Sequence, residues 1–214
     1  MSDIFREVDE DVRKEQYAKL WKKYGVYVIA LAALVVIGVG GWEAWKVYSA
    51  KQRQAASLEY ATALAALEER SAEEALADLR PLADPADGGY GLLATFQAAR
   101  IMAEQGDTES AAVLWGQIAD AASAEPGMRA MATLLMVQHR LGNADRQELD
   151  AALDPLLAPG NAFRPAALEL SAMVALQDGD GTAARARLEE LADDITAPQG
   201  ARTRATQLLA TLPE

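Results

Sequence analysis

An uninterrupted apolar stretch near the amino terminus constrains this chain more than any other feature. Residues 24–42, YGVYVIALAALVVIGVGGW, contain no charged side chain, and Lys22, Lys23 and Glu43 flank them. As an α-helix rising 1.5 Å per residue, such a segment spans roughly 28 Å, close to the ~30 Å hydrocarbon thickness of a bilayer. The stretch therefore predicts a transmembrane helix. The alternative is a buried helix of a soluble domain, but core helices seldom run this long without a charge.

Aromatic side chains at both ends of this segment support the membrane interpretation. They are Trp21, Tyr24 and Tyr27 at one end, and Trp42, Trp45 and Tyr48 at the other. Tyr and Trp rings are enriched at the level of the lipid headgroups, because one end of each ring system is apolar and the other is polar. We therefore assign residues 24–45 to a transmembrane helix, residues 1–23 to a charged tail and residues 46–214 to one domain.

Positive charge near the two ends of the apolar segment predicts its orientation. Residues 1–23 hold six Lys or Arg, whereas only Lys46, Lys51 and Arg53 follow closely on the other side. Cytoplasmic flanks carry the excess of Lys and Arg, so we expect the tail in the cytoplasm and the domain across the membrane. A cleaved signal peptide fits poorly, because the apolar region is too long and the tail carries six acidic residues.

The domain is strongly acidic and contains no cysteine. Residues 46–214 hold 14 Lys or Arg against 25 Asp or Glu, a net charge of −11, and no lysine follows Lys51. Binding to nucleic acid requires positive charge that neutralises phosphates, so the composition argues against it. The same charge keeps the domain away from anionic lipid. The absence of cysteine excludes disulfides and thiol chemistry.

Helix-length apolar patterns recur along the domain with a period near 36 residues. Turn signals fall at Arg70-Ser71, Gly106-Asp107, Gly142-Asn143 and Gly179-Asp180, at spacings of 36, 36 and 37 residues. The predicted helix pairs are 54–69 with 72–83, 90–105 with 108–121, 126–141 with 146–157, and 163–178 with 182–193, followed by a last helix at 199–212. Such a period is typical of a tetratricopeptide (TPR) solenoid. We therefore predict an all-α chain, in which a single transmembrane helix precedes a TPR-like helix-turn-helix solenoid; the alternative is an irregular helical bundle.

Small and large side chains recur at equivalent positions of the predicted units. The first helices place Ala63, Ala99, Leu135 and Ala172 at the tight inter-helix contact; the second helices place Ala75, Ala111 and Ala184, then Leu79, Trp115 and Leu188, then Leu82, Ile118 and Leu191. The third unit matches only with a two-residue insertion, which gives Leu153 and Leu156 and aligns Pro155 with Pro81. Ser71-x-x-Glu74 and Asp145-x-x-Glu148 resemble capping boxes at the start of second helices.

The first helices of a solenoid form a concave surface that binds partners. In this register the predicted partner-binding residues are Tyr60, Leu64, Leu67, Leu93, Phe96, Arg100, Met136, His139, Arg140, Met173 and Leu176. Aromatic, Met and Leu side chains beside Arg suit apolar peptide segments, because methionine surfaces repack around varied ligands. The alternative is that most of these side chains form core between neighbouring helices.

Residues for catalysis or metal binding are nearly absent. His139 is the only histidine, so a zinc site with several histidines is impossible, and its position within a helix favours a packing or exposed role. Asp178-Gly-Asp180-Gly181 faintly resembles a calcium loop, but Thr182 and Ala183 do not continue the pattern, so we interpret it as a turn. The sequence predicts no enzyme, no cofactor and no metal.

Several segments resemble one known family. They are Trp21–Gly25 (WKKYG), Gly41–Trp45 (GWEAW), Ser57–Tyr60 (SLEY) and Tyr90–Ala94 (YGLLA), in the order tail, apolar span and helical domain. In these features the chain resembles the YfgM-type ancillary subunits of the bacterial SecYEG translocon, whose TPR-like domain is related to one in the cell-division coordinator CpoB. The resemblance implies an anchor in the bacterial inner membrane and a domain in the periplasm.

The resemblance also implies a function. Members of that family are expected to associate with the SecYEG translocon and with periplasmic chaperones, and to assist unfolded exported proteins. We therefore expect a non-enzymatic, membrane-anchored binding protein. The alternative function is a scaffold that coordinates cell-envelope or cell-division machinery through the same groove. A membrane-bound hydrolase is disfavoured, because no catalytic constellation is present.

Overall fold

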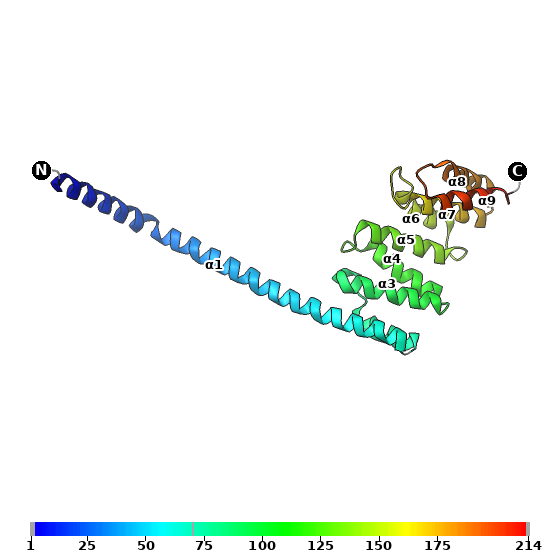
Figure 1. The fold of residues 1–214 in the computed structure, drawn as a ribbon, viewed down its shortest axis with the longest axis horizontal. Coiled ribbons are helices and arrows are strands. Elements are labelled where there is room, and N and C mark those ends of the chain that lie inside the picture. The colour runs from blue at the N-terminus through cyan, green and yellow to red at the C-terminus, as the bar shows by residue number, and fades with distance from the viewer. Residues whose placement is uncertain (1–2, 70, 213–214) are drawn as a thin grey trace. The chain divides into compact units, whose positions relative to one another are not determined.

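The computed structural model describes the backbone of residues 3–69 and 71–212, and the side chains within these ranges from Trp21 onward except those at 28, 32, 68 and 69. The described residues form helices joined by turns, with no strand among them. The chain divides into two compact units, residues 1–55 and residues 56–214 (Figure 1). Helix α1 (Asp3–Glu69) supplies the whole of the described first unit and the first helix of the second.

The first unit is a helix whose large apolar side chains have no protein to pack against. Val26, Leu34, Val36 and Val39 are among the many exposed apolar side chains of this segment, and their positions fall on different faces of the helix. Within the described residues, Trp21–Leu67 is the one helix that is long and apolar enough to cross a membrane by length and composition, with a mean hydropathy of 2.2 over its best window. A helix that is apolar on all sides is a buried or membrane helix.

The second unit continues with helices connected by short turns. They are α2 (Ala72–Leu79), α3 (Gly89–Glu104), α4 (Thr108–Asp120), α5 (Pro126–Arg140), α6 (Arg146–Leu153), α7 (Arg164–Gln177), α8 (Gly181–Asp193) and α9 (Gln199–Leu209), with single 3-10 turns η1 (Arg80–Leu82), η2 (Pro85–Asp87) and η3 (Asp154–Leu156). Each helix from α2 to α9 begins within one residue of its predicted start. The predicted starts of these helices are therefore confirmed.

Two predicted helices are shorter than expected, for the same reason. We expected second helices at 72–83 and 146–157, but α2 ends at Leu79 and α6 ends at Leu153, each followed by a 3-10 turn. Pro81 and Pro155 lie within these turns. A proline has no N–H and its ring clashes with the preceding turn of an α-helix, so each α-helix stops just before it. The last predicted helix also ends early, at Leu209 rather than 212.

Glycine and capping residues shape the turns between paired helices. Gly106, Gly142 and Gly179 adopt φ angles of 88°, 82° and 81°, which favour glycine because it has no Cβ. Asp107 and Asp180 then cap α4 and α8 by accepting hydrogen bonds from the N–H groups of Ser110 and Ala183. The turn predicted at Arg70-Ser71 lies partly outside the described residues, but Ser71 caps α2 by accepting from the N–H of Glu74.

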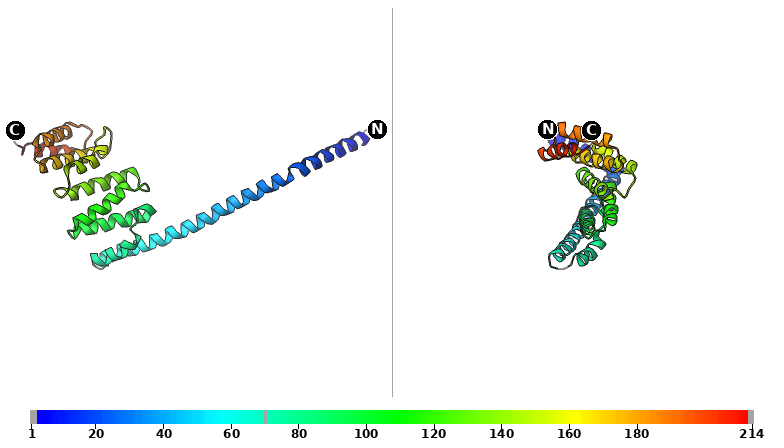
Figure 2. Two further views of the ribbon diagram at one scale, coloured as in Figure 1. Left: turned by 180° about the vertical axis from the view of Figure 1, so that it is seen from behind. Right: turned by 90° about the vertical axis from the view of Figure 1, so that its right-hand side faces the viewer.

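The core of the second unit follows the predicted repeat. The side chains predicted as tight contacts are fully or almost fully buried: Ala63, Ala75, Ala99, Ala111, Ala172, Ala184, Leu79, Trp115, Leu188, Ile118, Leu191, Leu153 and Leu156. Leu82 and Leu135 are the exceptions, since both are only half-buried. Each apolar cluster is shared between neighbouring helices, so α4 packs against α3 on one side and α5 on the other (Figures 1 and 2).

Candidate protein-binding surface

The structure places the predicted partner-binding residues on α1, α3, α5 and α7, and most of them contribute to packing. Six are half-buried and lie against an apolar cluster, namely Tyr60, Leu67, Phe96, Met136, Met173 and Leu176. Leu64 is also half-buried, whereas Leu93 is 37% exposed and Arg100 is exposed. The expected row of free apolar side chains is therefore largely used to join the helices to one another.

The arginines of the predicted surface form hydrogen bonds and ion pairs with neighbouring side chains. Arg100 binds Glu104 at 2.5 Å and Gln97 at 2.9 Å, both on its own helix. Arg140 forms a two-pronged ion pair with Glu148 of α6, in which Nη2 lies 3.1 Å from Oε2. The capping box predicted for Asp145 and Glu148 is therefore only half right: the Asp145 cap is confirmed and the role of Glu148 is wrong. Asp145 caps α6 through the N–H of Gln147, but Glu148 pairs with Arg140 of α5 rather than with the start of its own helix.

His139 packs against the buried Trp115. The two ring centroids are 4.6 Å apart with an interplanar angle of 49°. Nδ1 of His139 lies 3.0 Å from the carbonyl oxygen of Leu135. Since a carbonyl only accepts, this nitrogen carries the hydrogen. Trp115 is 2% exposed, and its own Nε1 has no hydrogen-bond partner among the described residues. The pair joins α4 to α5.

Three predicted residues, Met136, His139 and Arg140, meet at a groove that sequence reasoning did not foresee. We call it the α4 groove; its volume is about 670 Å³ and it is lined by Thr108, Glu109, Ala112, Val113, Gly116, Gln117, Asp120, Met136, His139, Arg140, Asn143 and Glu148. Seven of these twelve residues lie on α4, the second helix of its repeat, so the groove is not built from first helices alone. The one signal in the sequence is Gly116, because glycine is unfavourable inside a helix.

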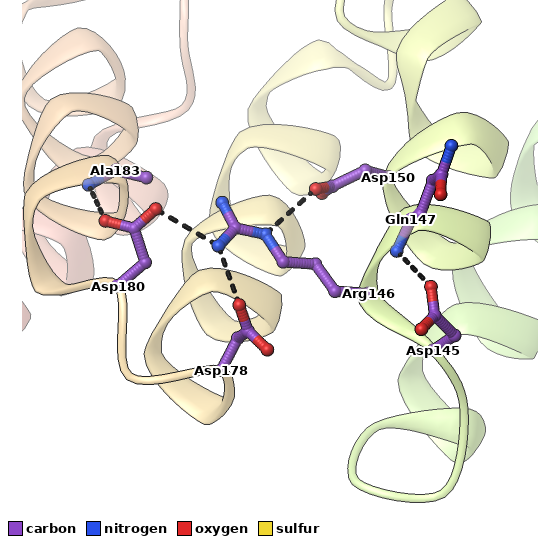
Figure 3. A network of polar contacts seen from close by, with 7 residues as sticks. All are labelled: Asp145, Arg146, Gln147, Asp150, Asp178, Asp180 and Ala183. Atoms are coloured by element: carbon purple, nitrogen blue, oxygen red, sulfur yellow. Dashed lines mark hydrogen bonds and ion pairs between the residues drawn. The ribbon is translucent and has the colours of Figure 1, made fainter.

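Sequence reasoning also missed a cluster of charged groups around Arg146, at the start of α6 (Figure 3). Nη1 of Arg146 lies 2.9 Å from Asp178 and 3.1 Å from Asp180, and Nε lies 3.2 Å from Asp150. These hydrogen bonds raise the pKa of Arg146, so the guanidinium stays charged. The cluster ties the third repeat unit to the turn of the fourth.

The segment that resembled a calcium loop is this turn. Asp180 accepts from the N–H of Ala183 at 2.9 Å and binds Arg146, and these two contacts, the backbone one foremost, lower its pKa. Asp178 binds the same guanidinium. Among the described residues, no group of three or more His, Asp or Glu side chains could hold a metal ion. The carboxylates of this turn bind the Arg146 guanidinium and thereby join α6 to the turn between α7 and α8.

Comparison with known protein families gives one match, which covers most of the chain. A model of a tetratricopeptide repeat-like domain matches residues 18–208. Comparisons with curated proteins and with solved structures give no significant match. The matched range contains the apolar part of α1 as well as the helical repeats, and TPR-like repeat domains are in general binding modules without catalytic activity.

Proposed function

Because the chain belongs to the tetratricopeptide repeat-like family over residues 18–208, we propose that it is a protein-binding module held to the bacterial inner membrane by one helix. The membership itself indicates protein partners in general. The single observation that carries the membrane anchor is the exposure of large apolar side chains along residues 26–39 of α1. Leaving so many apolar side chains in water is unfavourable by roughly 25 cal/mol per Å², and a bilayer removes that cost.

The proposed orientation places residues 1–23 in the cytoplasm and the domain in the periplasm. Six Lys or Arg precede the apolar segment, whereas Lys46, Lys51 and Arg53 are the only ones within its other flank. The proposed membrane helix covers residues 24–45, and the proposed periplasmic domain covers residues 46–214. The acidic surface of that domain suits a position close to the membrane without adsorption to anionic lipid.

The proposed role is that of an ancillary subunit of the SecYEG translocon that holds unfolded exported segments or a periplasmic chaperone. The support is the resemblance over Trp21–Gly25, Gly41–Trp45, Ser57–Tyr60 and Tyr90–Ala94. In the last of these segments, the structure requires glycine at position 91 in the first turn of α3. A Cβ on Gly91 would lie 2.2 Å from the carbonyl oxygen of Asp84. The exposed side chains of the predicted surface, such as Leu93, remain available to a partner.

Site-specific photocrosslinking in membranes tests this role. A photoreactive residue at Leu93 on α3 is compared with one at Ala186 on the exposed face of α8, and the crosslinked proteins are identified by mass spectrometry. We expect translocon subunits or exported polypeptides from the first position and far fewer from the second. Crosslinks to septal or wall-synthesis proteins would instead support the scaffold function, and equal crosslinking from both positions would contradict binding at this surface.

A further inference from the structure

The α4 groove carries a pattern of charge and apolar surface that points to a particular kind of partner. Along α4 its lining residues are Thr108, Glu109, Ala112, Val113, Gly116, Gln117 and Asp120. Their spacing of three and four residues puts them on one face of the helix. Carboxylates therefore stand at the two ends of this face, and the side chains between them are small or apolar except for that of Gln117. Val113, in the middle, is 57% exposed.

Of the two terminal carboxylates, only Glu109 has a stabilising role within the domain, because it lies in the first turn of α4, where a negative charge favours the helix dipole. Neither Glu109 nor Asp120 forms an ion pair with any described residue, and the one arginine of the groove, Arg140, is bound to Glu148. Asp120 is also the last residue of α4. A negative charge there opposes the helix dipole, whose negative end lies at the carboxyl terminus, so it does not stabilise the fold.

Gly116 keeps the middle of the groove open. It lies in the interior of α4, where glycine is less favourable than alanine by about 1 kcal/mol. A Cβ at this position would lie 3.3 Å from Sδ of Met136, so even alanine would crowd the methionine that lines the opposite wall. Methionine adapts its shape to varied apolar ligands. The floor of the groove is thus small, apolar and adaptable.

We propose that the α4 groove binds an extended peptide segment that carries two cationic side chains with apolar residues between them. Glu109 and Asp120 are eleven residues apart in sequence, so they stand about 16 Å apart along the helix axis. An extended chain covers this length in about five residues, at roughly 3.3 Å per residue. The inference rests on the proposed function as a protein-binding module and gives the chemistry of the segment bound.

The charge of the whole domain supports a cationic partner. Residues 56–214 hold 11 arginines and no lysine against 25 acidic residues. Arg100, Arg140, Arg146, Arg164, Arg187 and Arg204 are all engaged in ion pairs within the domain. The net field around the groove is therefore negative, and such a field attracts cationic ligands from solution and repels acidic ones.

Fluorescence anisotropy with designed peptides tests the proposal on the full chain in nanodiscs of zwitterionic lipid. The probe is a labelled apolar peptide with lysines at positions i and i+4, which lie on the same side of an extended chain and whose long side chains cover the remaining distance; one comparison peptide has the lysines adjacent, and another has glutamates in their place. We expect the probe to bind more tightly than both comparison peptides, and added salt to weaken it. In Glu109→Gln/Asp120→Asn the affinity should fall roughly fivefold, the scale expected for two exposed ion pairs.

A matched control separates the groove from the overall charge. Glu189→Gln/Asp193→Asn removes two exposed carboxylates of α8, outside the groove, and should leave the affinity unchanged. Val113→Ser, at an exposed position, should weaken binding without lowering the melting temperature. Equal losses in both charge variants, or tight binding of the glutamate peptide, would overturn the proposal. Neither result would change the outcome expected for crosslinking from Leu93, so that experiment tests the proposed function independently of this proposal.

Discussion

Gly91 is the glycine at which an added Cβ would come closest to a backbone atom. A Cβ there would lie 2.2 Å from the carbonyl oxygen of Asp84 and 3.3 Å from Cβ of Asp87. Because the nearest atom belongs to backbone rather than to a flexible side chain, the loop before α3 would have to move. Gly91→Ala should therefore destabilise the domain by about 1–3 kcal/mol, the usual cost of overpacking.

The measurement is urea denaturation of the full chain followed by circular dichroism. Gly200→Ala is the matched control, because Gly200 lies in the first turn of α9 and a Cβ there would meet its nearest atom, in the Arg204 side chain, only at 3.7 Å. That substitution should leave the stability unchanged or raise it slightly. Equal stability of the two variants would mean that α3 does not approach the Asp84 carbonyl as closely as described.

Trp115 is the largest buried side chain between α4 and its neighbours. Trp115→Ala should lower the free energy of unfolding by ~3–5 kcal/mol, the typical loss for a large buried aromatic side chain. Val113→Ala, two residues earlier but 57% exposed, should change it by less than about 0.5 kcal/mol. Thermal unfolding of both variants measures the difference. A small effect at Trp115 would contradict the repeat register predicted from the sequence.

The residues of the candidate surface were predictable only in part. Sequence spacing correctly placed His139 within a helix and Asp178 and Asp180 at a turn, because glycine and aspartate signals are local. It could not show that the His139 ring packs against the Trp115 ring, since these two residues lie on different helices and are 24 positions apart in sequence. Nor did it show the α4 groove, because an exposed face is recognised only once the buried face of the helix is known.

At the scale of the helices, the sequence predicted starts better than ends. The starts of α3, α4 and α7 carry capping residues or turn glycines close by, and each lies within one residue of its expected position. The ends of α2 and α6 depend on Pro81 and Pro155, which lie inside the predicted helices 72–83 and 146–157. Proline cannot continue an α-helix, and this restriction ended both helices although the apolar pattern continues past the prolines.

The links between helices were the least predictable part of the fold. Arg164 at the start of α7 binds Asp194 after α8 at 3.0 Å and also pairs with Glu190, while Arg204 of α9 forms a two-pronged pair with Glu169 of α7. These pairs join residues 26 to 35 positions apart. Charge composition cannot reveal them, because the choice of partner depends on how the helices pack.

The Asp180 carboxylate predicts a dependence of stability on pH. Its pKa in the folded domain is lowered, chiefly by the N–H of Ala183 and then by Arg146. A lowered pKa means that the ionised form stabilises the folded state, fully above the unfolded value of about 4. This contribution is lost as the pH falls through the folded pKa. In Asp180→Asn, which still caps α8, stability should change less between pH 5 and pH 3 than in the parent chain.

Urea midpoints across that pH range provide the measurement. Asp193→Asn serves as the control, because it removes an exposed carboxylate of α8 one turn or more from the Arg146 cluster. Asp194 also has a lowered pKa, first through the hydroxyl and N–H of Thr196, so some loss of stability in acid should remain in Asp180→Asn. An unchanged pH profile in Asp180→Asn would show that this carboxylate does not join the third and fourth repeats.

At the scale of the whole molecule, residues 1–55 and residues 56–214 suit different surroundings. Residues 26–39 expose large apolar side chains, while residues 56–214 bury most of theirs in shared clusters and carry a surplus of acidic groups. One part suits a lipid environment and the other suits water. The proposed function follows from this contrast together with the membership in the tetratricopeptide repeat-like family.

Cysteine labelling tests this arrangement most directly, because the chain has no cysteine of its own. Ser2→Cys reports on the tail and Ala186→Cys on an exposed site of α8. In intact spheroplasts, a membrane-impermeant maleimide should label Ala186→Cys fully and Ser2→Cys only after lysis, with both chains recovered in the membrane fraction. Labelling of Ser2→Cys alone before lysis would reverse the orientation, and recovery of either chain in the soluble fraction would contradict the membrane anchor.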